Sequence, residues 1–528
     1  MKHKPIDHAQ IDTGNELARR YITDFSRVES FYASDYRRPE HLAAQANRLI
    51  NRTWKNRFDR DELVQALLSY AERHPTPKAS LANIRKLQDP QCVCVVTGQQ
   101  SGLGGGPVMV LYKAMTAIKL AREVEKASGQ PCVPVFWNAS DDSDLEEINR
   151  IRSVDATGAL RKFRFDMQAG KRHVRNIAMP GHDDDSWDKA ETALGEGSYH
   201  DRAALLLRDS AGRDFGTGFT RLLLELLGSR GLIVIEPWAL TEHPAWKRLH
   251  TLEIDKREER RQGLQRVAER LDALGLPAGV AITNHLNLFK TINGERRHVT
   301  CEGKRLVIEG EDETVSKTAL MQQVRAEPAT FTPNVLLRPL VQNAIFPTVA
   351  YVGGPGEIAY HGLLKTLHRS SKVFMPALFP RLSMTLVDAD DAKMFDKVVS
   401  FRKRLLWRQK EAAIVFEEAQ SGVRRAFKDM REGLVGLARP LEQDIQKFEQ
   451  RTMRSASDAK VRVKHDALSI TEGGAEMQPL LNRYFPEDKP QERVTTLLSA
   501  YAKFGPKLIE AVDAVPEIFD FHHHVAVM

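Results

Sequence analysis

A glycine-rich loop between an expected buried strand and an expected helix is the feature that most constrains the fold. Residues 92–96 form a short apolar run of the buried-strand type, and 107–127 repeat their apolar residues at helical spacing. A second apolar run follows at 133–137. The order strand, loop, helix, strand predicts a βαβ unit with parallel strands and a right-handed crossover.

The strand–loop–helix pattern returns later in the chain. Residues 348–352 are strand-like, a Gly-Gly-Pro-Gly turn follows at 353–356, and 357–367 are expected to be helical. Two more strands are expected at 232–235 and 373–378. Since the carboxyl ends of parallel strands meet at one edge of a sheet, the two glycine-rich loops are expected to meet at one crevice. The predicted fold class is α/β, with a parallel-sheet core.

The remaining segments predict three further parts. Residues 16–87 have the pattern of a helical lead-in, and the Asn293-Gly294 pair between strand-like runs predicts an antiparallel meander within about 281–310. We therefore expect a core over 1–385 with inserted segments at about 155–310, a helical domain over 386–460, and a segment over 461–528 that returns to the core.

A heptad pattern predicts that the helical domain is a coiled coil. Apolar residues alternate in steps of four and three, which is the period of helices that pack along one seam. Pro440 lies inside the pattern and is expected to kink or break one helix. A helical hairpin, packed on itself or on a second copy, accounts for the pattern. The heptad residues are Val423, Phe427, Met430, Leu434, Leu437, Leu441, Ile445 and Phe448.

Composition argues against a disordered or fibrous protein. The 528 residues predict two or three domains, and 42% hydrophobic with 28% charged residues is typical of a globular protein. Four cysteines without a C-x-x-C pair predict a reducing compartment, and the first residues lack a signal peptide's apolar stretch. We expect a cytoplasmic protein with no membrane helix. The net charge of +7 suits anionic small molecules or nucleic acid.

The first glycine-rich loop is a candidate anion site, because backbone N–H groups ahead of a helix can cradle a negative charge. It lacks the Gly-Lys-Ser/Thr of a P-loop, and a tight turn that needs glycine only for its geometry is the alternative. The candidate residues are Thr97, Gly98, Gln99, Gln100, Gly105 and Gly106.

Carboxylates and a lysine are candidate catalytic groups. Asp142 and Asp144 follow the second strand and could bind an ammonium group or act as acid or base, although Ser143 and Glu146 have the spacing of a capping box. Lys113 lies in the helix after the loop, where it either reaches an anion or is solvated.

The second loop supplies the other rim of the expected crevice. No metal site is predicted, because the run His522-His523-His524 has no evident partner set. The rim candidates are Arg338, Gln342, Gly353, Gly354, Glu357, Tyr360 and Arg381, with His361 beside them.

These motifs resemble those of the bacillithiol-biosynthesis cysteine ligases, the BshC family, and the resemblance runs nearly end to end. It rests on Thr97-Gly98-Gln99-Gln100-x-Gly102-Leu103-x-Gly105-Gly106-Pro107, Tyr112-Lys113-Ala114, Phe136-Trp137, the run from Asn334 to Tyr360, Pro380-Arg381-Leu382-Ser383 and Pro490-Gln491-Glu492-Arg493.

The resemblance implies a Rossmann-like core with connecting-peptide insertions and an antiparallel coiled coil that makes a homodimer. It also implies a reaction that joins the carboxyl of L-cysteine to the amine of glucosaminyl-malate, giving bacillithiol. Forming an amide from a free carboxylate is uphill in water, so we expect the carboxyl to be activated by ATP with Mg²⁺.

One segment departs from the family pattern. The family has Glu-Asp-His-Asp after the tryptophan strand, whereas this chain has Asp141-Asp142-Ser143-Asp144. The main hypothesis is a ligase in which Asp142 and Asp144 orient a cationic amine. A catalytically silent paralogue that binds a thiol metabolite or a protein partner, motivated by Ser143, and an RNA-binding protein, motivated by the net charge, are the alternatives.

Overall fold

The computed structural model describes residues 2–7, 14–51, 54, 57–168, 170–303, 305–311, 313–406, 421, 425, 447, 450–452 and 474–528. The chain forms two compact units: Met1–Asp155, Leu160–Leu386 and Pro490–Met528 make the first, and Ala156–Ala159 with Val387–Lys489 make the second. The eight predicted heptad residues and Pro440 lie outside the described residues.

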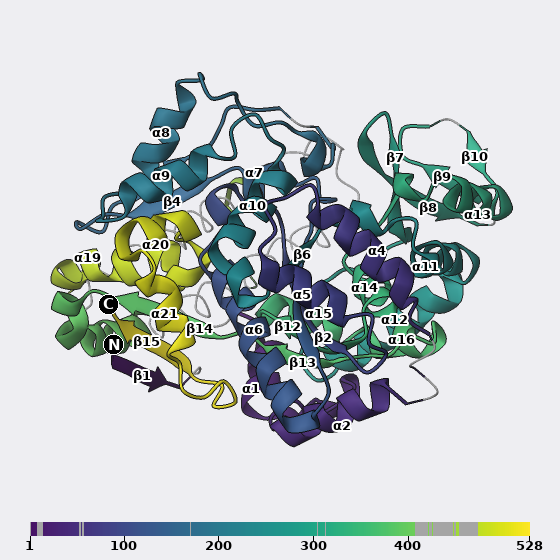
Figure 1. Ribbon diagram of the computed structural model, residues 1–528, viewed down its shortest axis with the longest axis horizontal. Coiled ribbons are helices and arrows are strands. Elements are labelled where there is room, and N and C mark those ends of the chain that lie inside the picture. The colour runs from purple at the N-terminus through teal and green to yellow at the C-terminus, as the bar shows by residue number, and fades with distance from the viewer. Residues whose placement is uncertain are drawn as a thin grey trace. The chain divides into compact units, whose positions relative to one another are not determined.

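A five-stranded parallel sheet forms the centre of the first unit (Figure 1). Its spatial order is β13-β12-β2-β3-β6, and every neighbouring pair is parallel. The strands are β2 (Val93–Gln99), β3 (Cys132–Asn138), β6 (Ile233–Ile235), β12 (Thr348–Gly353) and β13 (Ala377–Pro380). The predicted α/β class and the first βαβ unit are confirmed.

The crossover between β2 and β3 is the helix α6 (Met109–Ser128), which packs on both strands. Its apolar residues are buried all round, as expected for a helix covered by other elements as well as by the sheet. Gly129 ends the helix with a left-handed backbone (φ +71°), a conformation that glycine adopts without strain.

Three expected boundaries were wrong. β2 continues through Thr97–Gln99, because these residues pair with Phe136–Asn138 of β3 instead of starting the loop. The last strand is Ala377–Pro380, since pairing with β12 begins only at Ala377. The helix expected over 357–367 is two helices, α15 (Pro355–His361) and α16 (Lys365–Ser370).

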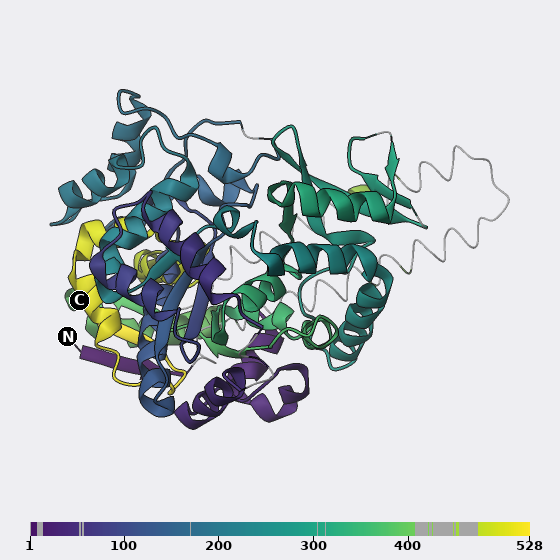
Figure 2. The ribbon, with the colours of Figure 1, turned by 45° about the vertical axis from the view of Figure 1, so that its right-hand side comes forward.

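The predicted meander is present as a separate antiparallel sheet, whose order is β10-β9-β8-β7-β11. Asn293 (φ +52°) and Gly294 (φ +82°) make the turn between β7 and β8, as this pair does in tight hairpins. Figures 1 and 2 show the sheet beside α11 (Pro244–Asp255) and α13 (Lys317–Ala326). The strands are β7 (His285–Ile292), β8 (Glu295–Glu302), β9 (Arg305–Ile308), β10 (Thr314–Val315) and β11 (Phe331–Pro333).

Helices account for most of the remaining described chain. The expected helical lead-in is α1 (Glu16–Thr23), α2 (Pro39–Leu49), α4 (Arg60–Ala71) and α5 (Lys78–Lys86). Between β3 and β6 lie α7 (Leu145–Ile148), β4 (Ile151–Val154), β5 (Leu160–Phe163), α8 (Ser186–Ala193), α9 (His200–Arg208) and α10 (Phe215–Leu227). After β6 come α11 (Pro244–Asp255), α12 (Arg257–Asp272), α13 (Lys317–Ala326) and α14 (Arg338–Ile345).

The C-terminal segment belongs to the first unit from Pro490 onward. Its helix α20 (Leu497–Phe504) begins where the Val108 N–H donates to the Thr495 carbonyl and the Leu497 N–H donates to the Gly106 carbonyl. The last strand, β15 (His523–Val527), pairs with β1 (Lys2–Ile6) and lies beside β14 (Ser383–Val387). Helix α21 (Lys507–Asp513) connects these parts.

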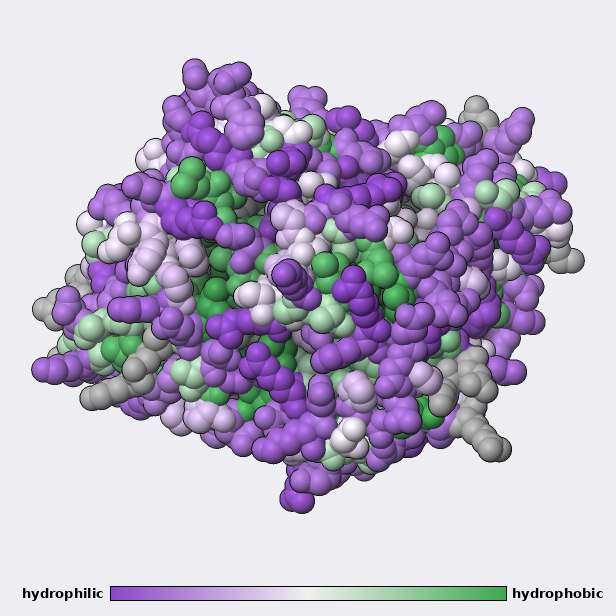
Figure 3. Space-filling view, viewed as in Figure 1, coloured by the Kyte–Doolittle hydropathy of each residue, from purple (hydrophilic) through white to green (hydrophobic). Residues whose placement is uncertain are grey.

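In the second unit, Arg483 and Tyr484 of α19 (Gly474–Tyr484) both donate to Asp391. These bonds hold α19 to the start of the segment Val387–Lys489. In the described residues of the chain, no helix is long and apolar enough to cross a bilayer. The face in Figure 3 is mainly hydrophilic, with apolar residues scattered between polar ones.

Gly98 tests the tight pairing of β2 with β3. A Cβ at Gly98 would lie 2.6 Å from the Trp137 carbonyl oxygen, so Gly98→Ala is expected to lower the free energy of unfolding by about 2 kcal/mol or more. Gly181→Ala is the control, because a Cβ there meets nothing within 4 Å. Equal stabilities of the two variants in urea denaturation would contradict the packing described.

Candidate functional site

The candidate site lies at the carboxyl edge of the parallel sheet. The chain runs from β2 through β3 to β6 in one direction, and then crosses to the other side of β2 to form β12 and β13. The strand order therefore reverses between β2 and β12, which is where ligands bind in open α/β sheets. The ends of these two strands carry Gln99 and Gly353, so the two predicted loops do meet.

A buried lysine joins the two loops. Lys113 of α6 donates from Nζ to the Gly98 carbonyl (2.5 Å), to Gln99 Oε1 (3.1 Å) and to Glu357 Oε2 (2.5 Å). Its side chain is 2% exposed, whereas that of Glu357 is 19% exposed. Burial lowers the pKa of Lys113, although the Glu357 carboxylate acts in the opposite direction. The alternative of a solvated lysine was wrong.

Glu357 accepts three hydrogen bonds at this edge. It accepts from Lys113, from the Tyr351 hydroxyl (2.6 Å) and from the N–H of Gly354 (2.9 Å). Burial alone would raise its pKa, but Lys113 and Arg338 together hold the pKa of Glu357 at about 2. The carboxylate is therefore ionised at every physiological pH, and the loop after β12 is fixed to α6 by charge.

Arg338 lies beside this pair with neutral hydrogen-bond partners. At the start of α14 it donates to the Tyr360 hydroxyl (2.6 Å), to Gln342 Oε1 (3.3 Å) and to the Tyr351 hydroxyl (3.5 Å). Within the described chain it forms no ion pair at salt-bridge distance. A half-buried guanidinium that donates to neutral oxygens keeps its charge available for a carboxylate or phosphate.

A second ion pair lies on the other side of the β2 end. Gln100 donates to Asp142 Oδ2 (2.7 Å), and Arg296 of β8 donates to Asp142 Oδ1 (3.0 Å). The Arg296 guanidinium also rests on the ring of Phe289, 4.0 Å from its centroid. Adjacent glutamines, Gln99 and Gln100, therefore contact one ion pair each. Asp142 has a cationic partner from the protein itself, which the sequence did not reveal.

Asp144 does not join this cluster. It is exposed, and its carboxylate accepts from the N–H of Glu147 as the N-cap of α7. The capping arrangement expected from Ser143 and Glu146 was therefore shifted by one residue. Asp141 is buried, and burial raises the pKa of its carboxyl group.

The glycines of the first loop are explained by packing. A Cβ at Gly105 would lie 2.8 Å from the Leu497 side chain, so α20 occupies the space that a side chain would need. The N–H groups of Gly105 and Gly106 donate to Gly102 and Leu103 within the loop. The prediction that these N–H groups cradle an anion is not supported, because the loop already satisfies them.

Thr97 and Arg381 hold the edge together instead of facing a ligand. The Thr97 hydroxyl donates to the Val352 carbonyl (2.9 Å) and so joins β2 to β12. Arg381 follows β13 and donates to Glu492 Oε1 (2.6 Å), with both side chains 3% exposed. The predicted basic rim at Arg381 is therefore a buried ion pair, and the motifs 380–383 and 490–493 are its two halves.

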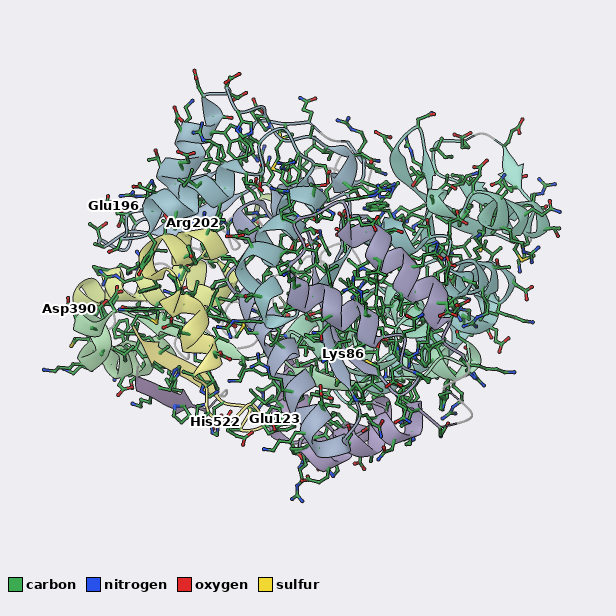
Figure 4. The ribbon with its side chains drawn as sticks, in the orientation of Figure 1. Lys86, Glu123, Glu196, Arg202, Asp390 and His522 are labelled. Carbon is green, nitrogen blue, oxygen red and sulfur yellow. The ribbon has the colours of Figure 1, made fainter. Side chains whose placement is uncertain are left out.

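Sequence reasoning gave no role to Arg296, Glu236 or Glu492, although Glu492 lies in the motif 490–493. Glu236 follows directly after β6, and this position at a strand's carboxyl end was the signal that could have found it. Arg296 gave no local signal, because its partner Asp142 is far away in sequence. Lys86 and Arg202, which Figure 4 labels, are by contrast exposed surface groups.

His523, the middle residue of the C-terminal histidine run, has two hydroxyl partners. His523 is buried, with Nδ1 bonded to the Ser383 hydroxyl (2.7 Å) and Nε2 to the Thr385 hydroxyl (2.8 Å). In the part of the chain that the structure describes, no group of three or more His, Cys, Asp or Glu residues is placed to hold a metal ion.

A parallel sheet whose strand order reverses, with charged side chains gathered at the reversal, defines a Rossmann-like protein with a candidate site at that edge. The family model "Bacillithiol biosynthesis BshC, N-terminal Rossmann-like domain" matches residues 1–382, and "Bacillithiol biosynthesis BshC, C-terminal coiled-coil domain" matches 383–528. The chain belongs to the BshC family, and its fold is a Rossmann-like domain followed by a coiled-coil domain.

Curated relatives match most of the chain. Proteins named "Putative cysteine ligase BshC" are 28% identical in Natranaerobius thermophilus (83% of each chain), 29% in Symbiobacterium thermophilum (94% of each) and 27% in Bacillus licheniformis (98% of this chain and 99% of the relative). The family is one of ligase enzymes in bacillithiol biosynthesis.

The Arg381–Glu492 pair predicts an acid-sensitive fold. Burial alone would raise the pKa of Glu492, but Arg381 holds it at about 2. The folded-state pKa lies below the ordinary value of 4.5, so this pair's contribution is present above pH 4.5 and is lost as the pH falls toward 2. Glu492→Gln is expected to cost roughly 3 kcal/mol at pH 7, because Arg381 is left buried without its counter-ion.

The measurement is urea denaturation at several pH values between 7 and 3. The variant should lose less stability on acidification than the unmodified protein. Glu196→Gln is the control, since the Glu196 side chain is 90% exposed, and it should leave the pH profile unchanged. If Glu492→Gln lost as much stability between pH 7 and pH 3 as the unmodified protein, the assignment of acid sensitivity to the Arg381–Glu492 pair would be refuted.

Proposed function

We propose that this protein joins the carboxyl group of L-cysteine to the amine of glucosaminyl-malate, the amide-forming step that yields bacillithiol. The family and the relatives' names support the ligase class and cysteine as one substrate. The observation that carries the proposal is the placement of Arg338 and the Lys113–Glu357 pair at the strand-order reversal. The Arg338 guanidinium suits a substrate with several carboxylates.

Each side chain has a distinct task in this proposal. Arg338, whose described hydrogen-bond partners are neutral, binds a malate or cysteine carboxylate. Lys113 uses its three N–H donors on the Gly98 carbonyl, Gln99 and Glu357, and so holds the two loops in the positions that the substrate requires. Asp142 is one-third exposed and orients the acceptor amine, with Arg296 and Gln100 holding its carboxylate in place.

Activation of the cysteine carboxyl by ATP with Mg²⁺ belongs to the proposal on chemical grounds. The loop N–H groups at Gly105 and Gly106 are used within the loop, and the described residues offer no ready cluster of metal ligands. The described side chains therefore do not fit a P-loop type of nucleotide site. No residue is assigned to the nucleotide, and no step is derived through it.

We also propose that the protein acts in the cytoplasm as a homodimer joined through its coiled-coil domain. The family model for that domain and the heptad pattern support an intermolecular seam. Sedimentation equilibrium measures the mass directly, and a species of 59.6 kDa at all concentrations would contradict the dimer.

The function is tested by product formation. Purified protein is mixed with L-cysteine and glucosaminyl-malate, with and without Mg-ATP, and bacillithiol is followed by mass spectrometry. Product that requires ATP is the expected result. Product without ATP would indicate another activated donor. Binding of either substrate without product would favour the silent paralogue, and Ser143→His would then test whether the missing imidazole is the reason.

The Lys113→Met variant tests whether Lys113 is needed for turnover in a protein that still folds. We expect turnover to fall by about a hundredfold or more, because the variant removes a buried charge at the substrate edge and leaves Glu357 without its partner. Lys86→Met is the matched control, since Lys86 is exposed at the end of α5 (Figure 4), and it should turn over normally. Circular dichroism confirms that both variants are folded.

Asp142→Asn tests the acceptor side of the site. The change keeps the shape of the side chain and its contact with Gln100, while it removes the negative charge that faces Arg296. We expect turnover to fall by about tenfold with the fold intact. An unchanged rate would remove Asp142 from the site.

A further inference from the structure

A buried hydrogen-bond chain connects the first glycine-rich loop to a glutamate outside the candidate site. Ser101 of the loop donates to Asn138 Oδ1 (2.5 Å), and Asn138 Nδ2 donates to the Thr220 hydroxyl (3.0 Å). The Tyr70 hydroxyl lies 2.9 Å from Thr220 and donates to Glu236 Oε1 (2.8 Å). Each of the five residues comes from a different part of the fold, and all are at most 2% exposed.

The donors of this chain all point the same way. Tyr70 has one hydroxyl hydrogen and gives it to Glu236, so the bond between Tyr70 and Thr220 is donated by Thr220. The chain is therefore polarised from Ser101 toward the carboxylate, and hydrogen bonds aligned in this way strengthen one another in a low-dielectric interior. Protonation of Glu236 lets the carboxyl group donate to Tyr70, which removes the fixed direction.

The surroundings of Glu236 leave it sensitive to protonation. A Cβ at Gly216 would lie 2.2 Å from Glu236 Oε2 and 2.9 Å from the Cβ of Ser140, so the carboxyl group is enclosed. Burial raises the pKa of Glu236 to about 7, the carboxylate of Asp214 acts in the same direction, and the hydrogen bond from Tyr70 opposes them. Tyr70 from α4, Asp214 from the start of α10, and Ser140 and Trp238 beside it are the groups that face it.

We propose that Glu236 is a positioning residue that holds the glycine-rich loop through Tyr70, Thr220, Asn138 and Ser101, and that loss of its negative charge loosens the loop. The loop carries Gln100, which contacts Asp142, and follows Gln99, which contacts Lys113. The consequence for turnover rests on the proposed function, whereas the consequence for the loop does not.

Hydrogen exchange of the loop amides is the direct test, and it needs no substrate. In the unmodified protein, protection of residues 100–106, corrected for intrinsic exchange, is expected to fall by about tenfold between pH 8 and pH 6. The Glu236→Gln variant lacks the carboxyl group that titrates. Its loop amides should therefore be weakly protected, and their protection should not depend on pH. Tyr70→Phe breaks the chain while Glu236 remains, and should also give a weakly protected loop.

Glu242→Gln is the matched control, because this glutamate lies six residues further on and its side chain is 68% exposed. It should keep the pH-dependent protection of the unmodified protein. A pH-dependent loop in Glu236→Gln, or a fully protected loop in Tyr70→Phe, would overturn the proposal. If either variant fails to fold, the other still decides the matter.

The pH dependence of kcat distinguishes a positioning role of Glu236 from a purely structural one. If the chain forms product, kcat should rise through pH 7 in the unmodified protein and should be lower and flat in Glu236→Gln, with KM changed less than kcat. An unchanged pH profile in Glu236→Gln would overturn the proposal. Absence of product in the unmodified protein refutes the proposed function alone, because the exchange experiment remains valid.

Discussion

The ion pair between Lys113 and Glu357 is the interaction on which the site depends. It joins α6, which follows the first glycine-rich loop, to α15, which follows the second, across the point where strand order reverses. Because Lys113 is almost fully buried, it is stable there only with a close anionic partner and carbonyl acceptors. Arg338, Tyr351, Gln99 and Gly354 are then arranged around Glu357 and Lys113 by direct hydrogen bonds or charge.

Two further ion pairs extend this arrangement. Arg296–Asp142 fixes the acidic segment after β3 and links the inserted meander to the core. Arg381–Glu492 fixes the returning C-terminal segment, whose Leu497 in turn packs on Gly105. The edge is therefore built by charges from distant parts of the chain. The inserted meander therefore supplies a residue, Arg296, to the candidate site.

The sequence predicted the parts of the fold that local patterns determine. Apolar strand runs, the helix over 107–127 and the Asn-Gly hairpin were all found, because period and turn chemistry act over a few residues. The motif residues Lys113, Glu357 and Arg338 were named and do lie together. Pairings such as Asp142 with Arg296 and Arg381 with Glu492 were not predictable, since their members are more than 100 residues apart. Glycines 105 and 106 were interpreted as an anion cradle because their packing partner, α20, comes from the far end of the chain.

The central claim is that Arg338 and the Lys113–Glu357 pair at the strand-order reversal form the binding site for the multiply charged acceptor. Isothermal titration calorimetry of glucosaminyl-malate against the unmodified protein and against the double variant Lys113→Met/Glu357→Gln tests this claim most directly. The double variant removes both charges of the pair, so neither charge is left buried without its partner. The account predicts that the unmodified protein binds and that the folded double variant binds at least about tenfold more weakly. Equal affinities would contradict it and would place the acceptor site elsewhere on the protein.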